Sequence, residues 1–223
     1  MLLQALALAA CDKPADVPAP VPSPSTSTAA VATPQAPERL ILAFGDSLYA
    51  GYGLERGQSL PDAIQSRLRA QGINATIVNA GVSGDTSAAG RQRFVFALDS
   101  MTRKPDLILL GLGGNDVLRQ IPPAETRANL TAMMDEAKKR DIPVVLTGMR
   151  APPNLGPDYT RAFDAIWPDL AETYGAGLYP FILDGVIGDA AVMQADHVHP
   201  NTAGVARIAD RVTPVVAARI KVG

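Results

Sequence analysis

The feature that most constrains this chain is an alternation of short apolar runs with longer amphipathic segments, which starts at Arg39. Four of the apolar runs are the clearest strand candidates: Leu40–Phe44, Thr76–Asn79, Leu107–Leu112 and Val144–Thr147. Strands separated by helix-length segments are typical of a mostly parallel sheet with helices on both faces. We therefore predict a single α/β domain, a three-layer α/β/α sandwich with a mostly parallel central sheet.

Three of the intervening segments have helical patterns: Leu60–Gln71, Ala124–Arg140 and Asn201–Ile220. In the second and third, apolar residues recur at helical spacing, which predicts one buried face for each helix. The methionines of the second segment belong to that face and need no cofactor to explain them. Pro214 lies inside the last segment, and we expect it to kink or shorten the helix.

Chemically distinctive residues follow the predicted strands. Gly45-Asp46-Ser47 comes after the first strand, 81–85 after the second and 113–116 after the third, while 196–201 directly precedes the last helix. Ligands of open α/β sheets bind at the carboxyl ends of the strands. We therefore expect these segments to meet in one functional site.

The residues before the domain have a different composition. Residues 1–11 are typical of an export signal, and Leu8-Ala9-Ala10-Cys11 resembles the bacterial lipoprotein cleavage box, which makes Cys11 the expected lipid-bearing residue. Residues 12–38 are rich in Pro, Ser, Thr and Ala and are predicted to be a disordered tether. We expect residues 39–223 to form the domain of an exported, periplasmic lipoprotein whose only contact with the membrane is this anchor.

The charge and cysteine content exclude several classes of protein. With 20 basic and 22 acidic residues the net charge is −2, which argues against binding to a nucleic-acid backbone. A single cysteine excludes an internal disulfide and a zinc site built on several thiolates. We expect a monomer held together by its apolar core.

A serine hydroxyl becomes a good nucleophile when a histidine accepts its proton and a carboxylate orients that histidine. The chain has two histidines, and His199 lies three residues after Asp196, so that one tight turn can supply base and orienting group to Ser47. The tetrahedral intermediate also needs hydrogen-bond donors for its oxyanion. Gly81, through its backbone N–H, and Asn115, through its amide, suit that role, with the N–H of Ser47 as a third donor.

These residues also carry a family resemblance. Phe44-Gly45-Asp46-Ser47-Leu48 resembles the GDSL block, and the segments around Gly81, at 113–116 and at Asp196-x-x-His199 resemble three further blocks in the same order. The match, from about Leu40 onward, is to the SGNH, or GDSL, hydrolases. The resemblance implies Ser47, Asp196 and His199 as the catalytic triad, Ser47, Gly81 and Asn115 as the oxyanion hole, and no metal or cofactor.

Within that family the chain is most similar to the periplasmic thioesterase I, arylesterase and lysophospholipase branch, through residues 84–87, 113–119 and 149–159. The resemblance implies acyl esters, thioesters or lysophospholipids as substrates. It also implies supporting or substrate-contacting roles for a set of neighbouring residues: Asp46, Asp116, Arg119, Met149, Arg150 and Pro152. The chain departs from the branch in its tether and in having Asp196-His197 where an Asp–Gly pair is common.

Four alternatives remain open from the sequence. The first is a carbohydrate or peptidoglycan O-acetylesterase that uses the same site. The second is a metal-dependent phosphoesterase built from carboxylates and imidazoles near the strand ends: Asp46, Asp116, Asp196, His197 and His199. The third is a dinucleotide-binding enzyme, for which Gly111-x-Gly113 lacks the third glycine, and the fourth is a lipoprotein that binds acyl or glycan ligands without catalysis.

Overall fold

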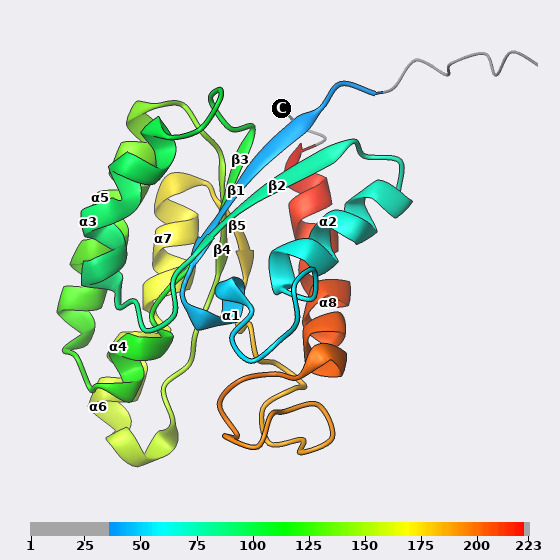
Figure 1. Cartoon of the computed structure of the whole chain (residues 1–223). Coiled ribbons are helices and arrows are strands. Elements are labelled where there is room, and N and C mark those ends of the chain that lie inside the picture. Colours follow the sequence, from blue (N-terminus) through cyan, green and yellow to red (C-terminus); the bar gives the residue numbers. More distant parts are fainter. Residues whose placement is uncertain (1–35, 221–223) are drawn as a thin grey trace, which may run out of the picture. The chain divides into compact units, whose positions relative to one another are not determined.

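The computed structural model describes residues 36–220, which form a parallel five-stranded sheet between two layers of helices (Figure 1). The strand order is β2-β1-β3-β4-β5. The strands are β1 (Arg39–Gly45), β2 (Ala75–Gly81), β3 (Leu107–Gly111), β4 (Val144–Thr147) and β5 (Gly177–Tyr179).

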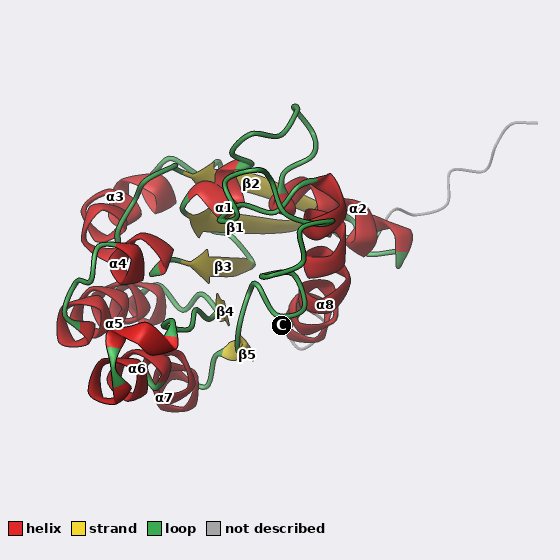
Figure 2. Ribbon diagram, turned by 90° about the horizontal axis from the view of Figure 1, so that it is seen from below, coloured by secondary structure: helices red, strands yellow, loops and turns green. Residues whose placement is uncertain are grey.

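The longer helices divide between the two faces of the sheet (Figure 2). On one side lie α3 (Ser87–Asp99), α5 (Pro123–Lys139) and α7 (Ile166–Tyr174), and on the other lie α2 (Leu60–Ala70) and α8 (Thr202–Ile220). Shorter helices occupy the loops beyond the carboxyl ends of the strands: α1 (Ser47–Ala50), α4 (Gly114–Leu118), the 3-10 turn η1 (Pro153–Leu155) and α6 (Pro157–Asp164). The predicted three-layer α/β/α fold is confirmed.

Burial explains why the inner strands read so clearly in the sequence. β1, β3 and β4 are covered on both faces, and nearly all of their residues are buried, as expected for parallel strands between two helical layers. All four predicted strands are present, within one or two residues of their predicted ends. The fifth strand, β5, was missed because it has three half-buried residues and no long apolar run.

The three predicted helices are also present. Ser59 caps α2 through a capping box with Asp62, and the apolar stripe of α5 lies in the core as predicted. Of the two effects expected of Pro214, a kink or a shortening of the last helix, the shortening does not occur, because α8 continues through Pro214 to Ile220.

The order of the strands places a switch point beside β1. The chain leaves β1 to form β2 on one side through α2, and it then crosses to β3 on the other side through α3, which covers the opposite face. The loops after neighbouring strands separate at such a point and leave a crevice. The loop that carries Ser47 lies there.

A row of glycines lets α1 pack tightly on the sheet at this point. Gly45 pairs in register with Gly81 on β2 and with Gly111 on β3. A Cβ at any of the three would collide with the buried ring or backbone of Tyr49, coming within 2.6 Å of its Cδ2 at Gly45 and within 2.7 Å of its Cζ at Gly111. The Tyr49 hydroxyl hydrogen-bonds Thr147 on β4 at 2.9 Å. These contacts anchor the helix that begins with Ser47.

Candidate functional site

Several of the functional residues expected from the sequence, among them Ser47, Asn115 and His199, line a cleft of about 830 Å³. The loops after β1, β2, β3 and β4 line it, together with the loop before α8. Apolar residues are the largest group in the lining: Leu48, Val117, Leu118, Met149, Ala151, Pro152, Pro153, Phe181, Leu183, Ile187 and Val198. A large, mainly apolar cleft with a few polar groups on one wall is typical of a binding site for a small organic ligand.

Ser47 is the first residue of α1 and is half-buried. Asp46 precedes it as the helix cap, with a carboxylate oxygen that accepts a hydrogen bond from the Leu48 N–H at 3.1 Å. Tyr49, two residues after Ser47 in the same helix, packs closely against the three strand-end glycines, and this packing fixes the helix that carries Ser47 relative to the sheet.

Asp196 and His199 lie in one tight turn before α8. One carboxylate oxygen of Asp196 accepts from the backbone N–H groups of Val198 and His199, at 2.9 and 3.0 Å. The other lies 2.7 Å from His199 Nδ1. The backbone and side-chain donors of His199, together with the Val198 N–H, lower the pKa of Asp196 to about 2. At neutral pH this carboxylate is ionised and can only accept hydrogen bonds.

The ionised carboxylate determines how the imidazole is used. Because Asp196 can only accept, His199 Nδ1 carries the proton of that hydrogen bond, and Nε2 is left with a free lone pair. Nε2 lies 2.8 Å from Ser47 Oγ, within hydrogen-bond reach of its hydroxyl. The structure thus brings Ser47, His199 and Asp196 together in the order that allows a serine hydroxyl to lose its proton to a histidine.

Asn115 faces the same cleft from α4. Its amide donates to the backbone oxygen of Asp85 at 3.0 Å, which fixes the side chain and leaves its second N–H available. Ser47 also lines the cleft, and its backbone N–H lies in the first turn of α1.

Gly81, the other oxyanion donor predicted from the sequence, is placed differently from Asn115 and Ser47. This residue does not line the cleft, and its N–H donates to the Asn79 side chain at 2.9 Å. Its missing side chain makes room for Tyr49, since a Cβ would lie 2.8 Å from the Cβ of that residue. Gly84, three residues further on, is exposed, has φ of 86° and does line the cleft. Gly81 is the last residue of β2, and the sequence analysis did not consider Gly84 for this role.

Asp46 and Asp116 are both buried, and they support the site in different ways. The carboxylate of Asp116 accepts from the Ser87 N–H at 2.7 Å, from the Ser87 hydroxyl and from the Thr126 hydroxyl at 2.9 Å, which joins α4 to α3 and α5. Burial raises the pKa of Asp46 from 3.8 to about 6, with the Asp116 charge adding to the effect and the Leu48 N–H and His199 opposing it.

Three of the four residues expected to contact substrate line the cleft: Met149, Arg150 and Pro152. Arg150 is exposed and lies over the Phe181 ring, with 5.7 Å from its guanidinium carbon to the ring centroid. The fourth, Arg119, is not part of the lining. It donates to the backbone oxygen of Gly84 at 3.0 Å and so supports the loop beside the cleft from outside.

The cleft also contains a residue that the sequence analysis missed. The Tyr52 ring covers His199, with 4.5 Å between ring centroids. Tyr52 follows Ser47 by five residues, but neither its spacing nor its type indicates this contact in advance.

The metal-dependent alternative requires Asp46, Asp116, Asp196, His197 and His199 to share an ion. Within residues 36–220, no three His, Cys, Asp or Glu side chains are placed to do so. The Asp116 and Asp196 carboxylates are instead bound to neighbouring N–H and hydroxyl groups.

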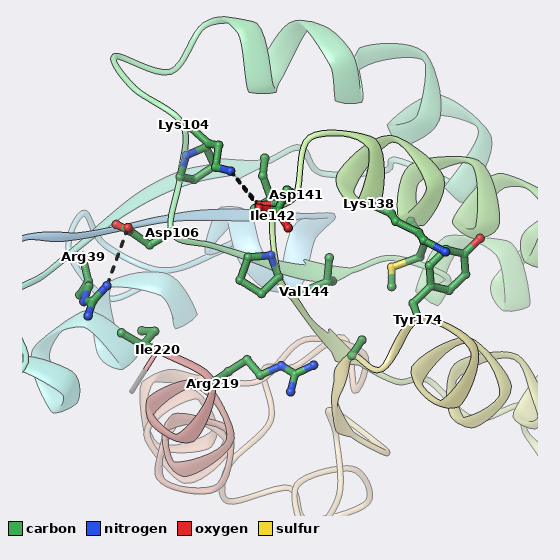
Figure 3. Close-up of a pocket in the computed structure, with 14 residues that line it drawn as sticks. Arg39, Lys104, Asp106, Lys138, Asp141, Ile142, Val144, Tyr174, Arg219 and Ile220 are labelled. Atoms are coloured by element: carbon green, nitrogen blue, oxygen red, sulfur yellow. Dashed lines mark hydrogen bonds and ion pairs between the residues drawn. The ribbon is translucent and has the colours of Figure 1, made fainter. Parts of the chain in front are cut away.

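A second pocket, of about 580 Å³, lies where the strands begin, at the end of the sheet opposite the cleft (Figure 3). Its lining includes four basic side chains and two acidic ones: Arg39, Lys104, Lys138, Arg219, Asp106 and Asp141. Among the described residues that line it there is no serine, cysteine or histidine. It therefore offers no nucleophile and base of the kind that the cleft contains.

Comparison with known proteins places the chain in a family. Residues 43–207 match the GDSL-like Lipase/Acylhydrolase family. The chain belongs to this family, and the predicted class of enzyme, an acyl hydrolase with an SGNH fold, is confirmed.

Named relatives agree with this assignment. The chain is 39% identical over 184 residues to "Esterase TesA" of Pseudomonas aeruginosa, which covers 82% of this chain and 90% of that protein. It is 35% identical to "Thioesterase 1/protease 1/lysophospholipase L1" of Escherichia coli K12, over 76% of this chain and 79% of that protein. Among solved structures it resembles AlinE4, an SGNH-hydrolase family esterase, at 53% identity and a TM-score of 0.71, over 82% of this chain and 97% of that one.

Three sequence predictions concern residues that the structure does not describe. The export signal, the tether up to residue 35 and the lipid-bearing Cys11 lie outside the described part of the chain. Within residues 36–220, no helix combines the length and apolarity that crossing a membrane requires.

Proposed function

We propose that this protein is a serine esterase that hydrolyses carboxylic esters or thioesters through an acyl-enzyme on Ser47. The observation that carries the proposal is the pair of short contacts made by His199, to Ser47 Oγ at 2.8 Å and to Asp196 at 2.7 Å. Nucleophile, base and orienting carboxylate within hydrogen-bond reach of one another are the geometric signature of this chemistry. The names of the relatives, esterase and thioesterase, support the same reaction.

In the acylation step, Ser47 Oγ attacks the carbonyl carbon of the bound ester while His199 Nε2 takes the hydroxyl proton. The resulting imidazolium is stabilised by the ionised Asp196 carboxylate at Nδ1. When the tetrahedral intermediate collapses, the bond to the leaving group breaks, and His199 returns the proton to the departing alcohol or thiol. Water then attacks the acyl-enzyme by the same route and releases the carboxylic acid and free Ser47.

The oxyanion of each intermediate requires donors on the same side of the cleft. We assign this role to the backbone N–H of Ser47, to the Asn115 amide and to the backbone N–H of Gly84. Gly84 replaces the Gly81 of the sequence analysis, because Gly84 lines the cleft and the Gly81 N–H is bound to Asn79.

The cleft favours acyl groups longer than acetyl. Its volume of about 830 Å³ far exceeds the space that an acetyl group needs, and its walls are mainly aliphatic and aromatic side chains. Burial of apolar substrate surface stabilises the complex by about 25 cal/mol per Å², so each added methylene within the cleft strengthens binding. This supports acyl esters, thioesters or lysophospholipids over the O-acetylesterase alternative.

The test is hydrolysis of p-nitrophenyl esters of increasing acyl length by the full chain, by Ser47→Ala and by Ser66→Ala. Ser66 is an exposed residue of α2 and serves as the matched control. We expect kcat to fall by several orders of magnitude in Ser47→Ala only, and kcat/KM to rise from acetyl to longer esters. Retained activity in Ser47→Ala, or activity that a chelator abolishes, would contradict the proposal.

We further propose that residues 1–11 direct export, that Cys11 is acylated and that residues 12–38 tether a monomeric domain of residues 39–223 to the membrane. The support is the sequence Leu8-Ala9-Ala10-Cys11 and the composition of the segment that follows it. Labelled palmitate should be incorporated into the parent and not into Cys11→Ala, and detergent phase partitioning should move that variant to the aqueous phase. Equal labelling of the two would exclude the anchor.

A further inference from the structure

Tyr52 covers the histidine that the proposed mechanism uses as its base. The two ring centroids are 4.5 Å apart, and the planes are inclined by 36°. The tyrosine side chain is otherwise open to the cleft, with 52% of the residue exposed. Part of the residue is therefore buried, and its ring packs against the ring of His199.

The tyrosine is held in this place by two separate loops. On one side, the Tyr52 backbone N–H donates to the backbone oxygen of Ser47, the proposed nucleophile, at 3.2 Å. From the other side, the Gln194 amide donates to the Tyr52 backbone oxygen at 2.7 Å and to the Pro200 backbone oxygen at 3.0 Å. The Gln194 backbone N–H donates to the His199 backbone oxygen at 2.8 Å.

Gln194 thus joins the loop after α1 to the loop that carries His199. The fit is close, since Gly53, with φ of 71°, leaves no room for a Cβ beside the Gln194 side chain. These hydrogen bonds fix the backbone of Tyr52 relative to the loop that carries His199.

The chemistry that this placement favours concerns the charged state of the base. His199 becomes an imidazolium each time it takes the Ser47 proton, and a cation near the face of an aromatic ring is attracted by the negative potential of that face. We propose that Tyr52 is a positioning residue, whose ring face stabilises the imidazolium of His199 and limits its rotation, and that Gln194 holds Tyr52 there. The inference rests on the proposed function.

Other charged groups act on the same imidazole and must stay constant in any test. Asp196 faces it from its own loop, and Asp46 lies near it in the segment after β1. Arg150, Asp164 and His197 line the same cleft. Replacement of the tyrosine ring by an apolar side chain changes none of these charges.

The test compares Tyr52→Leu, which removes the aromatic face, with Tyr52→Phe, which keeps it. In Tyr52→Leu we expect the acid limb of the kcat/KM profile to move down by about half a pH unit and kcat to fall about threefold. Tyr52→Phe should match the parent in both. Phe96→Leu is the matched control, because Phe96 is a 75% exposed aromatic residue on α3 that does not line the cleft.

An NMR titration separates this inference from the proposed function. The chain has two histidines, so its imidazole signals can be followed in full-length Ser47→Ala and assigned with His197→Asn. The midpoint of the His199 signal should fall by about half a pH unit when Tyr52→Leu is added and should not move with Tyr52→Phe. An unchanged midpoint in Tyr52→Leu, or equal shifts in both variants, overturns the role of the ring, whereas activity in Ser47→Ala overturns only the proposed function.

Gln194 is tested in the same framework. Gln194→Met keeps the size of the side chain and removes its amide donors, so it should produce part of the Tyr52→Leu effect on the acid limb. Because both changes act through one contact, the double variant should show little more than Tyr52→Leu alone. Fully additive effects would show that Gln194 does not act through Tyr52.

Discussion

The buried carboxyl of Asp46 makes the stability of this protein depend on pH in a direction that can be predicted. Asp46 is 2% exposed, and burial raises its pKa from 3.8 to about 6. In the unfolded chain the same group ionises near its usual value. Between about pH 4 and pH 6 the folded protein therefore binds more protons than the unfolded chain.

The sign and size of the effect follow from this difference. Because the folded state holds the extra proton, the contribution of Asp46 to stability is most favourable below the unfolded pKa. It declines as the pH rises and reaches its lowest value above the folded pKa of about 6. The shift of about two pKa units lowers the free energy of unfolding by about 3 kcal/mol at pH 8 and by about 1 kcal/mol at pH 4.5.

Asp46→Asn removes this titration and keeps the helix cap, since asparagine caps helices as well as aspartate does. The variant should be more stable than the parent at pH 8 by up to about 3 kcal/mol, which is about 6–12 °C in Tm. Its advantage should shrink by about 2 kcal/mol at pH 4.5. Urea unfolding of both proteins at the two pH values measures the difference.

Asp158→Asn is the matched control, because the Asp158 side chain is 94% exposed and its replacement should have no comparable dependence on pH. An equal advantage of Asp46→Asn at pH 4.5 and pH 8, or a more stable parent at pH 8, would refute the reasoning. Either result would mean that the folded protein solvates the ionised carboxylate as well as water does.

Three further predictions concern the cleft. Asp196→Asn removes the negative charge of the group that accepts from His199 Nδ1–H. With a chromogenic ester, kcat should therefore fall by about 10³–10⁴ with little change in KM. Asn115→Ala should lower kcat by about 10²–10³ if its amide binds the oxyanion, and a change confined to KM would contradict that role. His197 has φ of 56°, a conformation that costs a residue with a side chain about 1 kcal/mol, so His197→Gly should raise Tm by about 2–4 °C, and a lower Tm would show that the turn is not strained.

Periodicity predicted the parts of the fold in which burial is continuous along the chain. The central strands were found because they are buried between layers and leave continuous apolar runs, and α5 was found because its one buried face leaves a regular apolar stripe. Helix α3 was missed because its apolar and polar residues do not separate into two faces: Phe96 is 75% exposed, while Ser87 and Gly90 are buried. A helix whose burial does not follow its hydrophobicity gives no such pattern.

The functional site divides in the same way. Ser47, Asp196 and His199 could be predicted from the sequence, because the motif after the first strand and the three-residue spacing of Asp and His are local features. The choice between Gly81 and Gly84, the burial of Asp46 and the contact of Tyr52 with His199 depend on which loops meet above the sheet. Each of these features involves residues on separate elements. They are therefore determined by how β1, β2 and the loop before α8 pack against one another.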